Sequence, residues 1–215
     1  MDIKDTPHPE YNVTHAQLVS GLMKGPNEIL GETTPQTIAL VHAALGMAGE
    51  VGEVQQSLKA YRITKMKFPP GGRGNGPIRE ARHEIREARH EIVKELGDYE
   101  FYLQNLYQVL GVERVFPQEG TGAGSVVRAI AELSIDTAYV VDTIKKCFAY
   151  NRTLNYERIS ARLIAIEVWL YHLRAAYCGY EDEVRHANIA KLLKRFPDAV
   201  FTNERAIGQA DEEKG

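Results

Sequence analysis

Two pairs of acidic residues carry the most specific chemistry in this 215-residue chain. Glu50 and Glu53 lie in AGEVGEV, and Glu95 and Asp98 lie in KELGDYEFYL. Because residues three apart on a helix lie about one turn apart on one face, each pair would present two carboxylates together. If the two helices face each other, their oxygen atoms surround one space that suits Mg²⁺ or Mn²⁺ better than zinc. Magnesium bound in this way normally takes a phosphorylated substrate as a further ligand.

Three glycines share the helix expected to carry the first acidic pair. Each of Gly46, Gly49 and Gly52 costs about 1 kcal/mol relative to alanine in a helix. Three of them within seven residues predict the close approach of another backbone or of a ligand. The alternative interpretation is a pair of amphipathic helices with solvated acidic edges, and either acidic pair alone would favour it.

The elements that must position these residues are all helical. Apolar periodicity and turn signals predict helices over 14–24, 35–63, 78–110, 124–150, 156–177 and 181–195. We therefore expect a single all-α domain over 1–215. It would comprise an acidic helical hairpin (36–110), a linker (111–125), a second hairpin (125–177), and a C-terminal helix and tail (181–201).

A tandem duplication lengthens the second acidic helix, because residues 78–84 and 85–91 both read IREARHE. Seven residues make nearly two helical turns, so the insertion extends the helix with little rotation of its downstream face. The duplication also repeats an E-x-x-H spacing known from di-iron bundles. Both copies lie on one helix among arginines, which favours a solvated, salt-bridged surface. The preceding Gly/Pro-rich segment 67–77 is predicted to be a loop able to close over a triphosphate.

These segments resemble the all-α nucleoside triphosphate pyrophosphohydrolases, the MazG-like superfamily. The resemblance is carried by ALGMAGEVGEVQQSLKAY and EIVKELGDYEFYLQNL, which match the E-x-x-E and E-x-x-D helices of that family. HANIAKLLKRFPDAVF resembles the C-terminal segment of many members. The similarity covers roughly 36–110 and 184–201. It departs from the family pattern in the 41 residues (54–94) between the two motifs, a longer spacer than usual.

The resemblance implies a helical bundle that cleaves the α–β phosphate bond of an NTP or dNTP, giving a nucleoside monophosphate and pyrophosphate. Its Mg²⁺, for which Mn²⁺ would substitute, is expected on Glu50, Glu53, Glu95 and Asp98. One of the three glutamates would accept a proton from water. A purine such as dGTP is one possible substrate. Expected substrate-binding residues are His42, Arg62, Lys65, Tyr102, Asn188, Lys191 and Arg195. The family is commonly oligomeric, so we expect a homodimer or higher.

The second hairpin could be a degenerate repeat of the first. Aligning the two places Asp142 opposite Glu53 and Glu167 opposite Asp98. The second half would then keep one acid of each pair, which is too few for the same metal site. It is expected to complete the bundle structurally. Two further functions stay open, a non-catalytic helical interaction protein and a different di-metal carboxylate enzyme.

Composition narrows the class of protein. The chain is 44% hydrophobic and 26% charged, enough to bury a sizeable core, and its net charge of −3 gives no electrostatic case for nucleic acid or an anionic membrane. Cys147 and Cys178 show no metal-binding spacing and suggest a reducing compartment. No signal peptide, long apolar run or P-loop motif is apparent. A cytoplasmic location is expected, the host cytoplasm if a phage encodes the chain.

Overall fold

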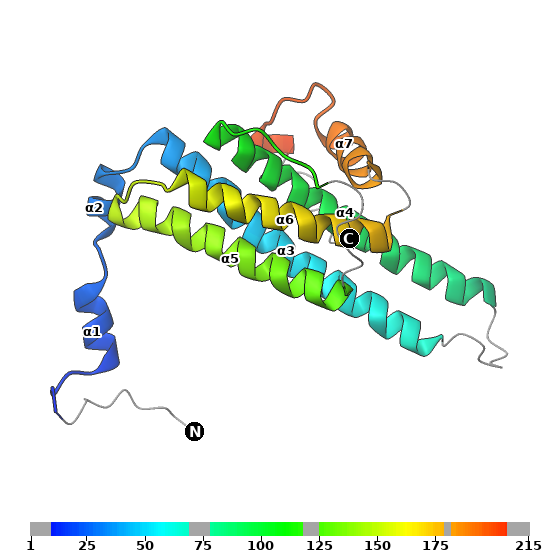
Figure 1. Cartoon of the computed structure of the whole chain (residues 1–215), viewed down its shortest axis with the longest axis horizontal. Helices are drawn as coiled ribbons and strands as arrows, with labels where there is room; N and C mark the ends of the chain where they lie inside the picture. Colours follow the sequence, from blue (N-terminus) through cyan, green and yellow to red (C-terminus); the bar gives the residue numbers. More distant parts are fainter. Residues whose placement is uncertain (1–9, 69–77, 118–124, 179–181, 206–215) are drawn as a thin grey trace.

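The computed structural model describes residues 10–68, 78–117, 125–178 and 182–205, and over these ranges it contains helices and no strands (Figure 1). The helices are α1 (His15–Leu22), α2 (Pro26–Gly31), α3 (Pro35–Lys67), α4 (Ile78–Leu110), α5 (Val126–Tyr150), α6 (Tyr156–Tyr177) and α7 (Glu183–Arg195). The expected all-α class is therefore confirmed. Short α2, which begins at a proline, was not predicted because six residues carry too little periodicity.

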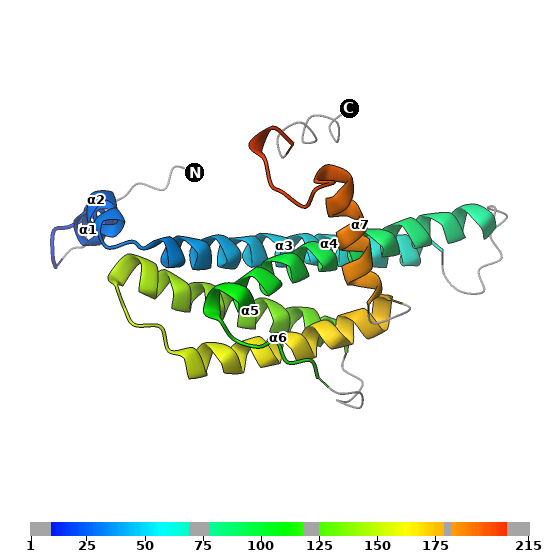
Figure 2. The ribbon, with the colours of Figure 1, turned by 90° about the horizontal axis from the view of Figure 1, so that it is seen from above.

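Two antiparallel hairpins form the body of the molecule. Helix α3 packs along α4, α5 packs along α6, and the hairpins meet mainly where α3 contacts α5. Figures 1 and 2 show the four long helices side by side, with α7 crossing the outer side of α4. This arrangement suits an internal repeat, but any four-helix bundle has it.

Capping residues explain several of the helix ends. The Thr34 side chain accepts a hydrogen bond from the backbone N–H of Thr37, and Pro35 begins α3, as the sequence predicts. Asn155 caps α6 in the same way through Arg158. Asn151 ends α5 in the left-handed conformation, with φ of 49°, which asparagine tolerates better than most residues. These local signals set the lengths of the helices that carry the acids.

The core runs the length of the bundle between the hairpins. Helix α4 contributes Tyr99, the largest fully buried side chain, whose hydroxyl is hydrogen-bonded to that of Thr137 on α5 at 2.7 Å. The buried apolar residues of α4 are Ile92, Val93, Leu96, Tyr99, Leu103, Leu106, Tyr107 and Leu110. Because this stripe fixes the rotation of α4, it also fixes the direction in which the neighbouring acidic strip faces.

The two acids of the second hairpin form no counterpart to the first pair. Asp142 is half-exposed and pairs with Lys145 and Lys146 at 2.6 and 2.5 Å. Glu167 is fully buried and pairs with Arg114 at 2.6 Å. Each acid therefore already has a cationic partner, in agreement with a structural role for this hairpin.

The duplicated heptads form the exposed beginning of α4. Glu80, His83, Glu87 and His90 are all exposed, and Arg86 lies 3.6 Å from Glu87. This is the solvated, ion-paired surface expected from the sequence. Most of the loop expected at 67–77 lies outside the described residues.

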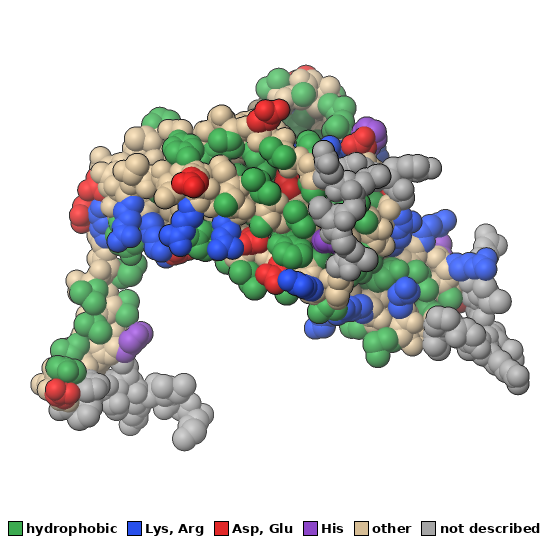
Figure 3. Space-filling model, viewed as in Figure 1, with side chains coloured by type: hydrophobic (Ala, Val, Ile, Leu, Met, Phe, Trp, Pro, Cys, Tyr) green, Lys and Arg blue, Asp and Glu red, His purple; other side chains and the backbone are tan. Residues whose placement is uncertain are grey.

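The surface mixes charge types. Figure 3 shows a row of Lys and Arg side chains over the α5–α6 hairpin, with apolar and acidic groups interspersed elsewhere on the same face. By length and composition alone, α3 could cross a membrane, contrary to the expected absence of a long apolar run. A core helix of a soluble protein passes the same test, and a third of the apolar window of α3 is buried inside the bundle.

Candidate functional site

Three carboxylates from two helices meet on one side of the first hairpin. Helix α3 supplies Glu50 and Glu53, and α4 supplies Glu95; one carboxylate oxygen from each lies within 4.8 Å of those of the other two. Glu53 is exposed, Glu50 is half-buried and Glu95 is buried. The cluster is therefore open to solvent on one side, and its oxygen ligands suit a hard divalent cation.

Asp98 lies beside this cluster but is bound by α7. Its Oδ1 accepts a hydrogen bond of 2.8 Å from the side-chain amide of Asn188. Its Oδ2 forms an ion pair with the ammonium group of Lys191. The structure thus brings together three of the four expected metal ligands and gives the fourth a cation from the protein itself. Asp98 would have to leave Lys191 to serve as a ligand.

The electrostatics of the cluster reflect burial and mutual repulsion. Burial raises the pKa of Glu50 to about 7, with further contributions from the negative charges of Asp98, Glu53 and Glu95. Burial also raises the pKa of Glu95, against the opposing effect of Lys94, whose ammonium group lies 3.6 Å away. Close carboxylates that raise one another's pKa values gain free energy when a cation is placed between them.

The glycines of α3 differ in what they contact. A Cβ atom at Gly46 would lie only 2.2 Å from Cδ1 of Tyr102, so the tyrosine ring rests directly on the α3 backbone. A Cβ atom at Gly49 or Gly52 would meet nothing within 4 Å. Gly46 therefore has a close neighbour, but it is a side chain and not the backbone or ligand that was predicted, and among the described residues Gly49 and Gly52 face open space.

A fourth glycine, which the sequence analysis did not single out, lets α7 approach α4. A Cβ atom at Gly97 would lie 2.9 Å from Cβ of Asn188 and 3.2 Å from the carbonyl oxygen of Val184. This close crossing carries Asn188 and Lys191 to Asp98. The position of Gly97 directly before Asp98 was the available signal.

Tyr102 lies beside the acidic cluster, and His42 lies next to Tyr102 in the N-terminal half of α3. Burial raises the pKa of Tyr102, with contributions from the charges of Glu50 and Asp98. The ring of His42 meets that of Tyr102 edge-on at a centroid distance of 5.7 Å. Tyr102 therefore adjoins the cluster, whereas His42 contacts the tyrosine ring.

The other three candidates for substrate binding lie elsewhere on their helices. Arg62 lines a second cavity, between α3 and α5. The Lys65 ammonium group lies over the Tyr61 ring at 5.2 Å, and Arg195 lies over the Phe196 ring at 5.9 Å. The structure provides no contact between Arg62 or Lys65 and the acids among the described residues.

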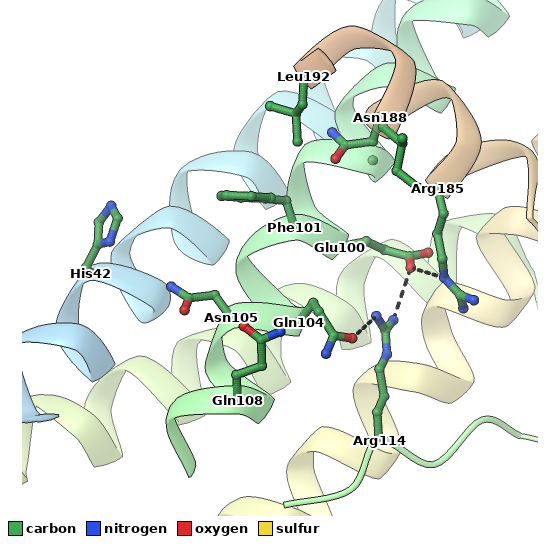
Figure 4. Close-up of a pocket in the computed structure, with 12 residues that line it drawn as sticks. His42, Glu100, Phe101, Gln104, Asn105, Gln108, Arg114, Arg185, Asn188 and Leu192 are labelled. Atoms are coloured by element: carbon green, nitrogen blue, oxygen red, sulfur yellow. Dashed lines mark hydrogen bonds and ion pairs between the residues drawn. The ribbon is translucent and has the colours of Figure 1, made fainter. Parts of the chain in front are cut away.

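A cavity of about 430 Å³ opens between α4 and α7 (Figure 4), and Gly97, the residue before Asp98, lines it. Its walls come from the outer face of α4 and from α7, with His42 at one end and Arg114 at the other. Carboxamide side chains predominate on the α4 wall, at positions 104, 105 and 108. Asn188 belongs both to this cavity and to the hydrogen-bonded surroundings of Asp98.

A network of buried charges closes the deep side of the cavity. The Glu100 carboxylate forms ion pairs with Arg174 at 2.5 Å, Arg185 at 2.9 Å and Arg114 at 3.1 Å. Burial acts to raise the pKa of Glu100, but Arg174 and Arg114 outweigh it and keep the pKa below its ordinary value. The network joins α4, α6, α7 and the segment after α4. It was missed because its members lie up to 85 residues apart.

Comparisons with known proteins return no relative: no family model matches the chain, and no curated protein or solved structure is significantly similar to it.

Proposed function

We propose that this chain is a Mg²⁺-dependent nucleoside triphosphate pyrophosphohydrolase of the MazG-like type. It would cleave the α–β phosphate bond of an NTP or dNTP to yield a nucleoside monophosphate and pyrophosphate, with Mn²⁺ able to replace Mg²⁺. The observation that carries the proposal is the convergence of Glu50, Glu53 and Glu95 from two helices, within 4.8 Å. A triphosphate carries about four negative charges near neutral pH, so it requires cations to approach these acids.

Four carboxylates are assigned to the metal. Glu50, Glu53 and Glu95 would hold Mg²⁺, joined by Asp98 once that residue has left Lys191. When bound, the ion neutralises phosphate charge and lowers the pKa of a water molecule. The carboxylate and water preferences of Mg²⁺ match a cluster that is open to solvent at Glu53.

The proton acceptor would be whichever of Glu50, Glu53 and Glu95 keeps a carboxylate oxygen that the metal does not use. In the metal-free chain, burial and the neighbouring carboxylates raise the pKa of Glu50 to about 7, and a bound cation would offset this repulsion and lower the pKa again.

Lys191 and Asn188 are assigned to the substrate phosphates. Both reach the acidic cluster from α7 through their contacts with Asp98. If Asp98 served as a metal ligand, the ammonium group of Lys191 would be free to bind a phosphate oxygen nearby. A positive charge in that place stabilises the charge that develops during phosphoryl transfer.

A screen of the eight common NTPs and dNTPs with Mg²⁺ or Mn²⁺, separating pyrophosphate from phosphate, tests this function. We expect pyrophosphate release that EDTA abolishes. Glu53→Gln and Asp98→Asn should each lower the rate about 100-fold, the scale of losing a metal ligand. Glu84→Gln, on the same helix as Asp98 but in the duplicated segment, is the matched control and should retain activity. Full turnover in EDTA, or equal losses in all three variants, would refute the proposed site.

A further inference from the structure

The cavity along α4 begins within one residue of the candidate metal ligands. Gly97, which lines it, directly precedes Asp98, and Asn188 on the opposite wall donates to the Asp98 carboxylate. At about 430 Å³ the cavity has the size of a small-molecule site. A ligand with its phosphates at the acids would therefore have room for its remaining part here.

The hydrogen bond from Arg114 to Gln104 fixes the polarity of one wall. Oε1 of Gln104 accepts from Nη1 of Arg114 at 3.3 Å (Figure 4). A guanidinium group has donors and no acceptor, so the carboxamide of Gln104 must turn its oxygen toward Arg114. Its amide nitrogen is then left with two N–H groups for other partners. Gln104 is a donor to whatever binds beside it.

The end of the cavity lined by Glu100, Arg114 and Arg185 also favours a hydrogen-bond acceptor. Both carboxylate oxygens of Glu100 are already taken by Arg174, Arg114 and Arg185, so this residue has little acceptor capacity left for a ligand. Nη2 of Arg185 is buried and has no hydrogen-bond partner among the described residues. With Glu167, the network holds three arginines against two glutamates. The amide nitrogen of Gln104, with the positive charges of Arg114 and Arg185 behind it, therefore favours an electron-rich acceptor.

The remaining lining groups suit a flat heterocycle. Phe101 is 47% exposed and offers a ring face beside the cavity. The carboxamides of Asn105 and Gln108 form no hydrogen bond within the described part of the chain and can present either their oxygen or their nitrogen. These two residues can therefore bind either donors or acceptors on a ligand, whereas the amide nitrogen of Gln104 can bind acceptors only.

We propose that this cavity binds the base of a nucleoside. It selects bases with a carbonyl group at C6 of a purine or C4 of a pyrimidine over bases with an amino group at that atom. Guanine, hypoxanthine, uracil and thymine would be preferred to adenine and cytosine. The assignment rests on the proposed function in taking the ligand to be a nucleoside. A carbonyl oxygen accepts from the amide nitrogen of Gln104, whereas an exocyclic amino group would set donor against donor and leave both unpaired, which a polar site rejects strongly.

Two pairs of nucleosides provide the test, inosine with adenosine and uridine with cytidine, because each pair exchanges a carbonyl for an amino group at one position. Nucleosides lack phosphates, so their binding to the full chain can be measured by ligand-detected NMR titration in EDTA, without turnover. We expect the carbonyl member of each pair to bind about tenfold more tightly, as a specific base contact gives. Gln104→Leu should reduce this preference to less than about twofold.

Gln55→Leu is the matched control, because Gln55 is also an exposed glutamine with one side-chain partner, Ser134 at 2.6 Å, and does not line this cavity. It should retain the full preference. Equal affinities within both pairs, a preference for the amino members, no binding of any nucleoside, or an unchanged preference in Gln104→Leu would each overturn the assignment. Nucleoside preference without pyrophosphate release would refute the proposed reaction alone, and pyrophosphate release without base preference would refute the base site alone.

Discussion

At the scale of single residues, Asp98 connects the acidic cluster to the rest of the molecule. Its charge is balanced by Lys191 and by a hydrogen bond from Asn188, so the fourth acid is stabilised without a metal ion. A metal ion that used Asp98 would have to compete with this internal ammonium group. If Mg²⁺ binds as proposed, its affinity would therefore depend on a residue that is not itself a metal ligand.

Replacing Lys191 should expose this competition. Lys191→Met removes the ammonium group from Asp98, so Mn²⁺ affinity of the nucleotide-free protein is expected to rise by roughly threefold to tenfold, the effect of one partly screened charge. Titration calorimetry or Mn²⁺ EPR would measure it. Lys194→Met, at an exposed position one turn along the same helix, should leave the affinity unchanged. A fall in affinity would mean that Lys191 assists metal binding instead.

The raised pKa of Glu50 predicts a pH dependence of stability without metal. Because the pKa of Glu50 is about 7 in the folded chain against an ordinary value of 4.5, the folded chain holds the proton over this range while the unfolded chain loses it. The contribution of Glu50 to stability should therefore fall as pH rises from about 4.5 to 7.

Glu50→Gln should remove this loss. In EDTA at pH 8 the variant is expected to be more stable than the parent by roughly 1–2 kcal/mol, discounted for the partial exposure of the group. At pH 4 the two should have similar stability. Urea unfolding at the two pH values gives the comparison. A difference that does not change with pH would show that Glu50 is not protonated in the folded chain at neutral pH.

At the scale of elements, the position of α3 against α4 depends on a missing side chain at Gly46. The Tyr102 ring occupies the space that a Cβ atom would need. Gly49 and Gly52 have no such neighbour in the described chain, although all three carry the same unfavourable helix propensity. Comparing substitutions at these three positions therefore distinguishes the effect of close packing from that of helix propensity within one helix.

Alanine substitution should act in opposite directions at these sites. Gly46→Ala is expected to destabilise the protein by about 1–3 kcal/mol, because the ring of Tyr102 must move. Gly49→Ala should stabilise it by about 0.5–1 kcal/mol through helix propensity. Thermal or urea unfolding of the two variants tests both values. Equal effects at both positions would mean that the Tyr102 ring moves without cost.

The elements also show how far the sequence could lead. Apolar periodicity and caps such as Thr34 are local, and they predicted six of the seven helices described, with the ends shifted by a few residues. The proximity of Glu50 and Glu95 could be predicted because both residues lie on the two helices of one hairpin. The ion pairs of Glu100 did not, because Arg174 and Arg185 lie 74 and 85 residues away, and nothing local selects them as partners. The resemblance indicated the cluster but not the attachment of Asp98 to Lys191.

At the scale of the whole molecule, one chain supplies all the acids of the candidate site. Glu50, Glu53, Glu95 and Asp98 belong to a single hairpin, and the second hairpin completes the bundle around it. We expect a homodimer or higher oligomer in which each site belongs to one chain.

Mixing two inactive variants tests whether a site is self-contained. Glu53→Gln chains and Asp98→Asn chains, co-expressed or refolded together, should show no more pyrophosphate release than the separate parents. If each site belongs to one chain, every site in a mixed oligomer still lacks one of its four acids. Size-exclusion chromatography with light scattering would establish that mixed oligomers form. Recovery well above both parents would mean that acids from two chains share a site.

Helix α7 has a consequence for the energetics of binding. Lys191 of this helix contacts Asp98 beside the acidic cluster, and Arg185 contacts Glu100 in the cavity wall. One helix therefore links the two places. Suppose that a cation at the acids shifts this helix and thereby changes the affinity of the cavity for a base by some factor. Thermodynamic reciprocity then requires an occupied cavity to change the cation affinity by the same factor. Neither ligand could be described as the effector of the other, because a single coupling free energy would belong to both.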